Sequence, residues 1–125
     1  MPAPHASSEA FYQVLADAKI MHDRKQADYG TDNDPFANVR SAVDYGLPAH
    51  LGCAIRMGDK TRRLESFYKR GNLVNEGAED AVMDLLVYCG IWLVLFREEM
   101  AAGDPDGLAD KIATARAYLD QAIPQ

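Results

Sequence analysis

The sequence predicts an all-α protein in which a single domain forms a bundle of four main helices. Apolar residues recur at the three- and four-residue spacing of helices along most of the chain, with no sustained alternation that would predict a strand. Capping residues, prolines and glycines stand where helices of ordinary length would begin and end. The chain of 125 residues suits one domain, 1–125, with Met1–Ser8 as a loose end.

The first helix is expected to begin after Ser7 or Ser8, because either residue is a good N-cap. It should end near Tyr29 and Gly30, where the glycine can adopt the left-handed conformation that terminates helices. The segment that follows is rich in turn residues. We expect it to hold a short helix over Pro35–Tyr45.

Three further main helices complete the predicted bundle. Pro48 is suited to the first position of the second one, which should stop near Gly71. Asn75 is the predicted N-cap of the third, which should run to about Ala102. The last helix should begin at Asp104-Pro105, a capping residue followed by a helix-starting proline.

The third main helix is apolar on every side from Leu85 to Phe96. This run is shorter than the roughly 20 residues that a membrane-spanning helix needs, so we expect no membrane association. One small bundle cannot easily cover a helix that is apolar all round. The sequence therefore predicts a homodimer or homotetramer.

The N-terminal residues have neither the basic stretch nor the apolar stretch of a signal peptide, which favours the cytoplasm. Cys53 and Cys89 lie in apolar helical contexts without a CxxC partner. We therefore expect buried free thiols rather than a disulfide. The net charge of −6 argues against binding to a nucleic acid polymer.

The charge is unevenly placed along the chain. A basic stretch from Arg56 to Arg70 is followed directly by an acidic stretch from Glu76 to Asp84. This order fits a small polyanion held together with a metal ion. A solvated surface of salt bridges explains the same pattern, and the sequence leaves both interpretations open.

Four carboxylates form the acidic stretch. Glu76, Asp80 and Asp84 follow one another at intervals of four residues, so on one helix they would share a face with Glu79 beside them. Such oxygen ligands suit Mg²⁺ or Mn²⁺. Alternatively, the helix dipole explains Glu76 and Glu79, and a salt bridge to Lys60 or to Arg63 would satisfy Asp84.

The preceding helix supplies Asp59, Lys60 and Arg63. If the two helices are antiparallel neighbours, as their short connection suggests, Asp59 would face the acids as a further metal ligand. Lys60 and Arg63 would then meet phosphate oxygens.

Four segments in this order resemble one family. They are Lys25–Gly30 (KQADYG), Pro35–Val39 (PFANV), Arg56–Glu65 (RMGDKTRRLE) and Glu76–Cys89 (EGAEDAVMDLLVYC). Together they resemble the MazG-like, all-α nucleoside triphosphate pyrophosphohydrolases, in a phage-associated branch linked to nucleotide modification. The resemblance implies metal-dependent hydrolysis of a (deoxy)nucleoside triphosphate, with dGTP or GTP as the suggested substrate, to the monophosphate and pyrophosphate.

By this resemblance, the metal ligands would be Asp59, Glu76, Asp80 and Asp84, and the catalytic carboxylates would be Glu79, Asp80 and Asp84. Lys25, Tyr29, Asn38, Lys60 and Arg63 would bind the substrate. Members of the family generally pair an ExxE motif with a later ExxD motif. Here Ala81 stands three residues before Asp84, and Asp59-Lys60 replace two expected glutamates. The departures leave open a non-catalytic nucleotide-binding dimer or a purely structural helical dimer.

Overall fold

The structure, a computed structural model, describes residues 3–29, 34–72, 77–103 and 105–122, apart from the side chains of residues 27–29, 105–106 and 122. Every regular element within these ranges is helical, which confirms the predicted all-α class. The elements are α1 (Ala6–Tyr29), α2 (Ala37–Arg40), the 3₁₀ helix η1 (Ser41–Tyr45), α3 (Ala49–Arg70), α4 (Ala78–Ala101) and α5 (Pro105–Ala122).

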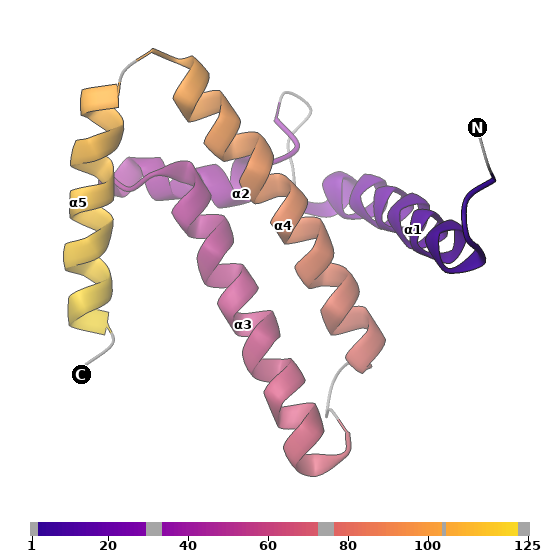
Figure 1. Ribbon diagram of the computed structural model, residues 1–125. Coiled ribbons are helices and arrows are strands. Elements are labelled where there is room, and N and C mark those ends of the chain that lie inside the picture. Colours follow the sequence, from indigo (N-terminus) through magenta and orange to yellow (C-terminus); the bar gives the residue numbers. More distant parts are fainter. Residues whose placement is uncertain (1–2, 30–33, 73–76, 104, 123–125) are drawn as a thin grey trace.

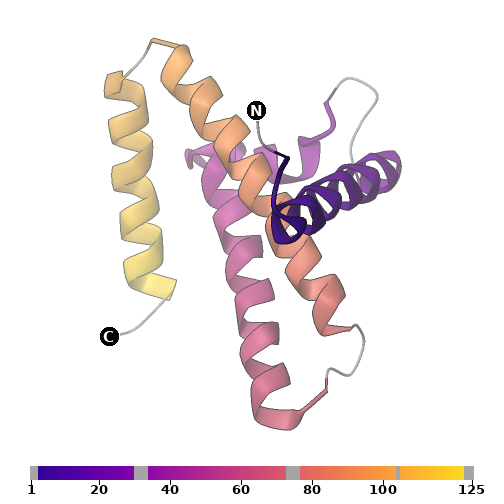
Figure 2. The ribbon, with the colours of Figure 1, turned by 45° about the vertical axis from the view of Figure 1, so that its right-hand side comes forward.

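Helices α3 and α4 form an antiparallel hairpin at the centre of the molecule (Figure 1). Helices α1 and α5 lie on opposite sides of this hairpin, and a view turned by 45° shows the same arrangement (Figure 2). Within the described ranges, no helix is long and apolar enough to cross a membrane. The hairpin therefore provides the frame on which the other helices pack.

The core consists of two clusters along the upper part of the hairpin. Val39, Ala49, Cys53 and Leu95 are buried together, with aromatic rings of α4 packed against them. A smaller cluster joins Leu47 and Leu51 to Ala115 of α5. Cys53 and Cys89 are both free thiols, as predicted, although Cys89 is only half-buried. Burial raises the pKa of the Cys53 thiol to about 11, which keeps it protonated.

Most predicted helix ends are confirmed to within about two residues, but α1 begins at Ala6, inside the segment Met1–Ser8 that the sequence predicts to be a loose end, so neither Ser7 nor Ser8 is its N-cap. Gly71 ends α3 in the left-handed conformation, at φ 80°, and its N–H donates to the carbonyl of Phe67. The predicted start of the third main helix is wrong, because the N-cap of α4 is Gly77 and not Asn75. The extended backbone of Gly77 (ψ 154°) delays the first helical turn. As a result, α4 does not include Glu76, which lies outside the described residues.

Candidate functional site

Asp84 lies at the point where three helices meet. It stands in the second turn of α4 and is only 6% exposed. Its Oδ1 atom lies 2.6 Å from Nζ of Lys25 on α1, and its Oδ2 atom lies 2.9 Å from Nζ of Lys60 on α3. Burial acts to raise the pKa of Asp84, but the hydrogen bonds and charges of the two lysines outweigh burial and lower it. Asp84 is therefore a buried, ionised carboxylate with two cationic partners.

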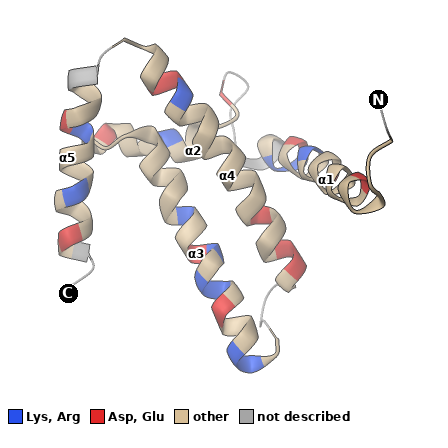
Figure 3. Ribbon diagram, in the orientation of Figure 1, with Lys and Arg blue, Asp and Glu red and all other residues tan. Residues whose placement is uncertain are grey.

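A cavity of about 280 Å³ opens beside this ion triad. Three cationic side chains line it, namely Lys25, Arg56 and Lys60, against the single carboxylate of Asp84. Figure 3 shows basic residues along α3 and acidic residues near the start of α4. Among the described residues that line the cavity, three are cations and one is a carboxylate, although the whole chain carries a net charge of −6.

The remaining cavity wall is mixed in character. Gln26 and Asn38 contribute side-chain amides, and Val87, Tyr88 and Ile91 of α4 contribute an apolar surface. A cavity that combines an apolar wall with a few convergent polar groups is typical of a small-molecule site. Amides next to an apolar wall can recognise a planar heterocycle.

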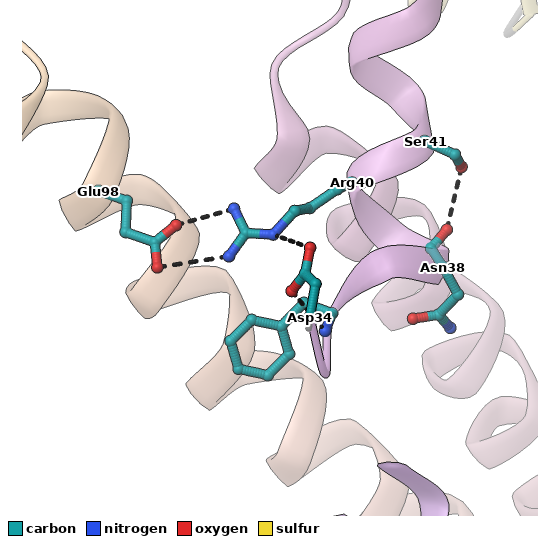
Figure 4. Close-up of polar contacts among 6 residues, drawn as sticks. Asp34, Asn38, Arg40, Ser41 and Glu98 are labelled. Atoms are coloured by element: carbon teal, nitrogen blue, oxygen red, sulfur yellow. Dashed lines mark hydrogen bonds and ion pairs between the residues drawn. The ribbon is translucent and has the colours of Figure 1, made fainter. Parts of the chain in front are cut away.

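Arg40 holds the wall formed by residues 34–40 against α4 (Figure 4). Its Nε atom lies 2.7 Å from Oδ2 of Asp34, and its Nη1 atom donates to Oε2 of Glu98 at 2.8 Å. The hydrogen bond to Glu98 is the largest of the effects that raise the pKa of Arg40. Ser41 Oγ donates to the carbonyl oxygen of Asn38 at 3.0 Å, which steadies the backbone there. This network positions Asn38 at the cavity.

The structure brings together four of the residues predicted for the site: Lys25, Asn38, Lys60 and Asp84. It adds three that the sequence interpretation missed, namely His22, Gln26 and Arg56. His22 stands three residues before Lys25 and four before Gln26, so a helix brings its side chain close to both, and Arg56 stands one turn before Lys60. Helical spacing from a predicted site residue was thus the signal that could have found Arg56.

Four other predicted residues that the structure describes do not line the cavity. Glu79 and Asp80 are exposed in the first turn of α4. Asp59 pairs with Arg62, 2.6 Å away, and Arg63 is exposed on α3. Tyr29 is the last residue of α1, but its side chain lies outside the description, as does all of Glu76.

These positions bear on the predicted Mg²⁺ or Mn²⁺ site. Within the part of the chain that the structure describes, no group of three or more histidine, cysteine, aspartate or glutamate residues could hold a metal ion. Each carboxylate oxygen of Asp84 already faces an ammonium group, whereas Mg²⁺ requires several oxygen ligands. The described carboxylates by themselves do not fit a protein-held metal.

Comparison of the chain with models of protein families, with characterised proteins and with solved structures finds no match. The resemblance drawn from the four sequence segments therefore stays a prediction. The chemistry of the cavity is the basis for a functional proposal.

Proposed function

We propose that this chain is a nucleoside triphosphate pyrophosphohydrolase whose cavity holds the phosphate groups of its substrate. The observation that carries the proposal is the cationic cavity: Lys25, Arg56 and Lys60 converge around one buried carboxylate. Lysine and arginine are the side chains that proteins use to bind phosphate.

Arg56 strengthens the case for an anionic ligand. Among the residues that the structure describes, no ion-pair partner is found for its guanidinium group, which lines the cavity and reaches solvent. A guanidinium group matches the geometry of phosphate oxygens and can bind two of them at once. A phosphate placed here would pair with the cationic side chains that line the cavity.

The apolar wall and the amides support a nucleoside as the rest of the ligand. Val87, Tyr88 and Ile91 offer a surface for a base or sugar, and Gln26 and Asn38 offer donors and acceptors for a base edge. Since the cavity of about 280 Å³ is small for a ligand site, it suits part of a nucleotide, with the remainder reaching solvent. The suggestion of guanine rests on the sequence resemblance alone.

In the proposed reaction, the oxygen of a water molecule bonds to the α-phosphorus, and the bond from that phosphorus to the α–β bridging oxygen breaks. The water gives its proton to a carboxylate that acts as the base, and pyrophosphate leaves. The cationic side chains would stabilise the negative charge that develops on the leaving group. Glu79 and Asp80 stand at the start of α4, about one turn from Asp84, and are the proposed catalytic carboxylates. Mg²⁺ or Mn²⁺ belongs to the proposal through the resemblance.

A second candidate is a nucleotide-binding protein without catalytic activity. The observation that favours it is the pairing of both Asp84 oxygens with lysines, which suits a binding site more than a metal-dependent catalytic centre. Nucleotide would then stabilise the fold without being consumed.

A panel of the common dNTPs and NTPs tests these candidates. Each nucleotide is incubated with the protein in Mg²⁺, in Mn²⁺ and in EDTA, with separate detection of pyrophosphate and orthophosphate. The hydrolase proposal predicts release of pyrophosphate, and not orthophosphate, from at least one nucleotide. A rise in melting temperature with nucleotide but no turnover across the panel would establish the second candidate. If neither is seen, the chain is a structural helical protein.

We also propose that the chain assembles with copies of itself through α1 and α4. Between these helices lies an open groove of about 510 Å³, lined almost wholly by apolar side chains that include Leu15, Leu86 and Leu93. Leu93 is 45% exposed, and Phe11 and Val14 of α1 are exposed as well. Contiguous apolar surface of this kind is typical of an interface. A second copy would cover it.

Leu93→Glu is expected to convert the assembled form to monomer, because a carboxylate placed in an apolar interface must be desolvated without a partner. Size-exclusion chromatography with light scattering measures the mass. Met100→Glu is the matched control: it introduces the same charge at an exposed apolar residue of α4 outside the groove, and it should leave the mass unchanged. A wild-type protein that is monomeric throughout the micromolar range would refute the interface.

A further inference from the structure

We infer that Asp84 is the counterion of a metal-independent polyphosphate site and not a metal ligand. The site consists of Lys25 on α1 and of Arg56 and Lys60 on α3. The inference rests on the proposed function for its ligand class, since it concerns how the same cavity holds a phosphate chain. It departs from the role that the sequence pattern predicts for Asp84.

The geometry of the triad pairs both carboxylate oxygens of Asp84 with lysines. Each carboxylate oxygen of Asp84 takes one ammonium group, from a different helix, at 2.6 Å and 2.9 Å. A cation that used these oxygens as ligands would have to displace an ammonium or lie beside it against like-charge repulsion. Asp84 is buried, so its position is fixed by packing, and the two lysines are held at the cavity wall without a ligand.

The pairing with Asp84 also positions Lys25 and Lys60 before a ligand binds. A lysine side chain has many rotamers, and part of this rotamer entropy is lost when its ammonium is held in one place. Because Asp84 already restrains Lys25 and Lys60, the binding of a phosphate there costs less side-chain entropy than it would if the two lysines were unrestrained. A lysine ammonium has three N–H donors, so the bond from Lys25 to Asp84 leaves donors for phosphate oxygens.

The charges of the residues that line the cavity also favour an anionic ligand. Three cations and one carboxylate are found among the described residues that line the cavity, and Arg56 has no ion-pair partner among the described residues. This preponderance of cationic side chains suits a phosphate or a short segment of a polyphosphate. It does not match a divalent cation.

The test measures binding of inorganic triphosphate to the full chain in EDTA by isothermal titration calorimetry. Wild type is expected to bind, and Lys25→Met and Lys60→Met, which keep the apolar stem of each side chain, are each expected to weaken binding about tenfold or more. Arg62→Gln is the matched control, because Arg62 is an exposed cation of α3 that pairs with Asp59 away from the cavity. It should change the affinity less than about twofold.

Titration with Mg²⁺ alone provides the opposite arm. The counterion role predicts no Mg²⁺ binding that depends on Asp84, so wild type and Asp84→Asn should behave alike. Mg²⁺ binding that Asp84→Asn abolishes would overturn the inference. So would a wild type that fails to bind triphosphate in EDTA, or lysine variants that bind it as wild type does. Circular dichroism melts on each variant confirm that it is folded.

Failure of this inference and failure of the proposed function give different results. Triphosphate binding in EDTA, without hydrolysis of any nucleotide, would support the anion site and remove the hydrolase activity. Pyrophosphate release from a nucleotide that strictly requires added metal, with no triphosphate binding in EDTA, would support the hydrolase and remove the metal-independent site.

Discussion

Asp84→Ala is expected to lower the free energy of unfolding by about 3 kcal/mol, because loss of one partner from a buried ion pair leaves uncompensated charge. The Lys60 side chain is only 18% exposed and would lose its ion pair with Asp84, whereas Lys25, at 43% exposed, can turn to water. The effect should therefore lie at the lower end of the range for buried pairs. Urea denaturation followed by circular dichroism measures it.

Asp59→Ala is the control for this prediction. It removes a carboxylate that also pairs with a cation 2.6 Å away, but in an exposed pair on α3. Pairs of this kind contribute at most about 1 kcal/mol, so the change should be small. If Asp84→Ala unfolds at the same urea concentration as wild type, the triad does not hold the three helices together.

The same variant carries a pH signature. The folded-state pKa of Asp84 is lowered from the ordinary carboxyl value of 3.8. Its contribution is therefore fully present above that ordinary value and is lost as the pH falls through the lowered folded-state value. The difference in stability between wild type and Asp84→Ala should shrink in strong acid.

Inorganic triphosphate, by supplying negative charge to Lys25 and Lys60, should raise the melting temperature of the Asp84→Ala variant.

Gly52→Ala is expected to destabilise the fold by about 1–3 kcal/mol, as overpacking of a well-filled core does. A Cβ atom on Gly52 would lie 2.6 Å from the carbonyl oxygen of Val39, so α2 would have to move away from α3. Val39 is buried in the main core and also lines the cavity. The variant should therefore melt at a lower temperature and also bind triphosphate more weakly.

Gly58→Ala supplies a matched control with the opposite sign. Gly58 lies on the same helix, and a Cβ atom there would meet only the flexible end of Arg62, at 3.4 Å. Replacing a helical glycine with alanine removes an entropic disadvantage of about 0.5–1 kcal/mol, so this variant should be slightly more stable. Equal effects at the two glycines would show that the close approach of α2 to α3 is not important.

The helix boundaries show what local sequence can predict. Gly71 and Pro105 mark the end of α3 and the start of α5, because glycine tolerates the left-handed conformation and proline suits the first helical turn. The wrong boundary, at Asn75, arose because asparagine is the stronger N-cap by local preference, whereas Gly77 is the N-cap of α4.

The site was predictable only in part. The acid within the apolar segment indicated that Asp84 must have partners, and Lys60 was among the candidates because it lies on the neighbouring helix of a hairpin. Lys25 as a direct partner could not be predicted, since it is 59 residues away in the sequence and no spacing rule links the two. The pairing of Arg40 with Glu98, 58 residues apart, was hidden for the same reason.

Periodicity and capping are local properties of the chain, and they were enough to establish an all-α protein, its main helices and a buried acid that needs partners. Which cations reach that acid depends on how α1 and α3 pack on α4, and this is set by apolar side chains distributed over the whole chain. Packing therefore decided that Asp84 faces two lysines at a cationic cavity, while the carboxylates expected beside it lie in solvent or outside the described residues.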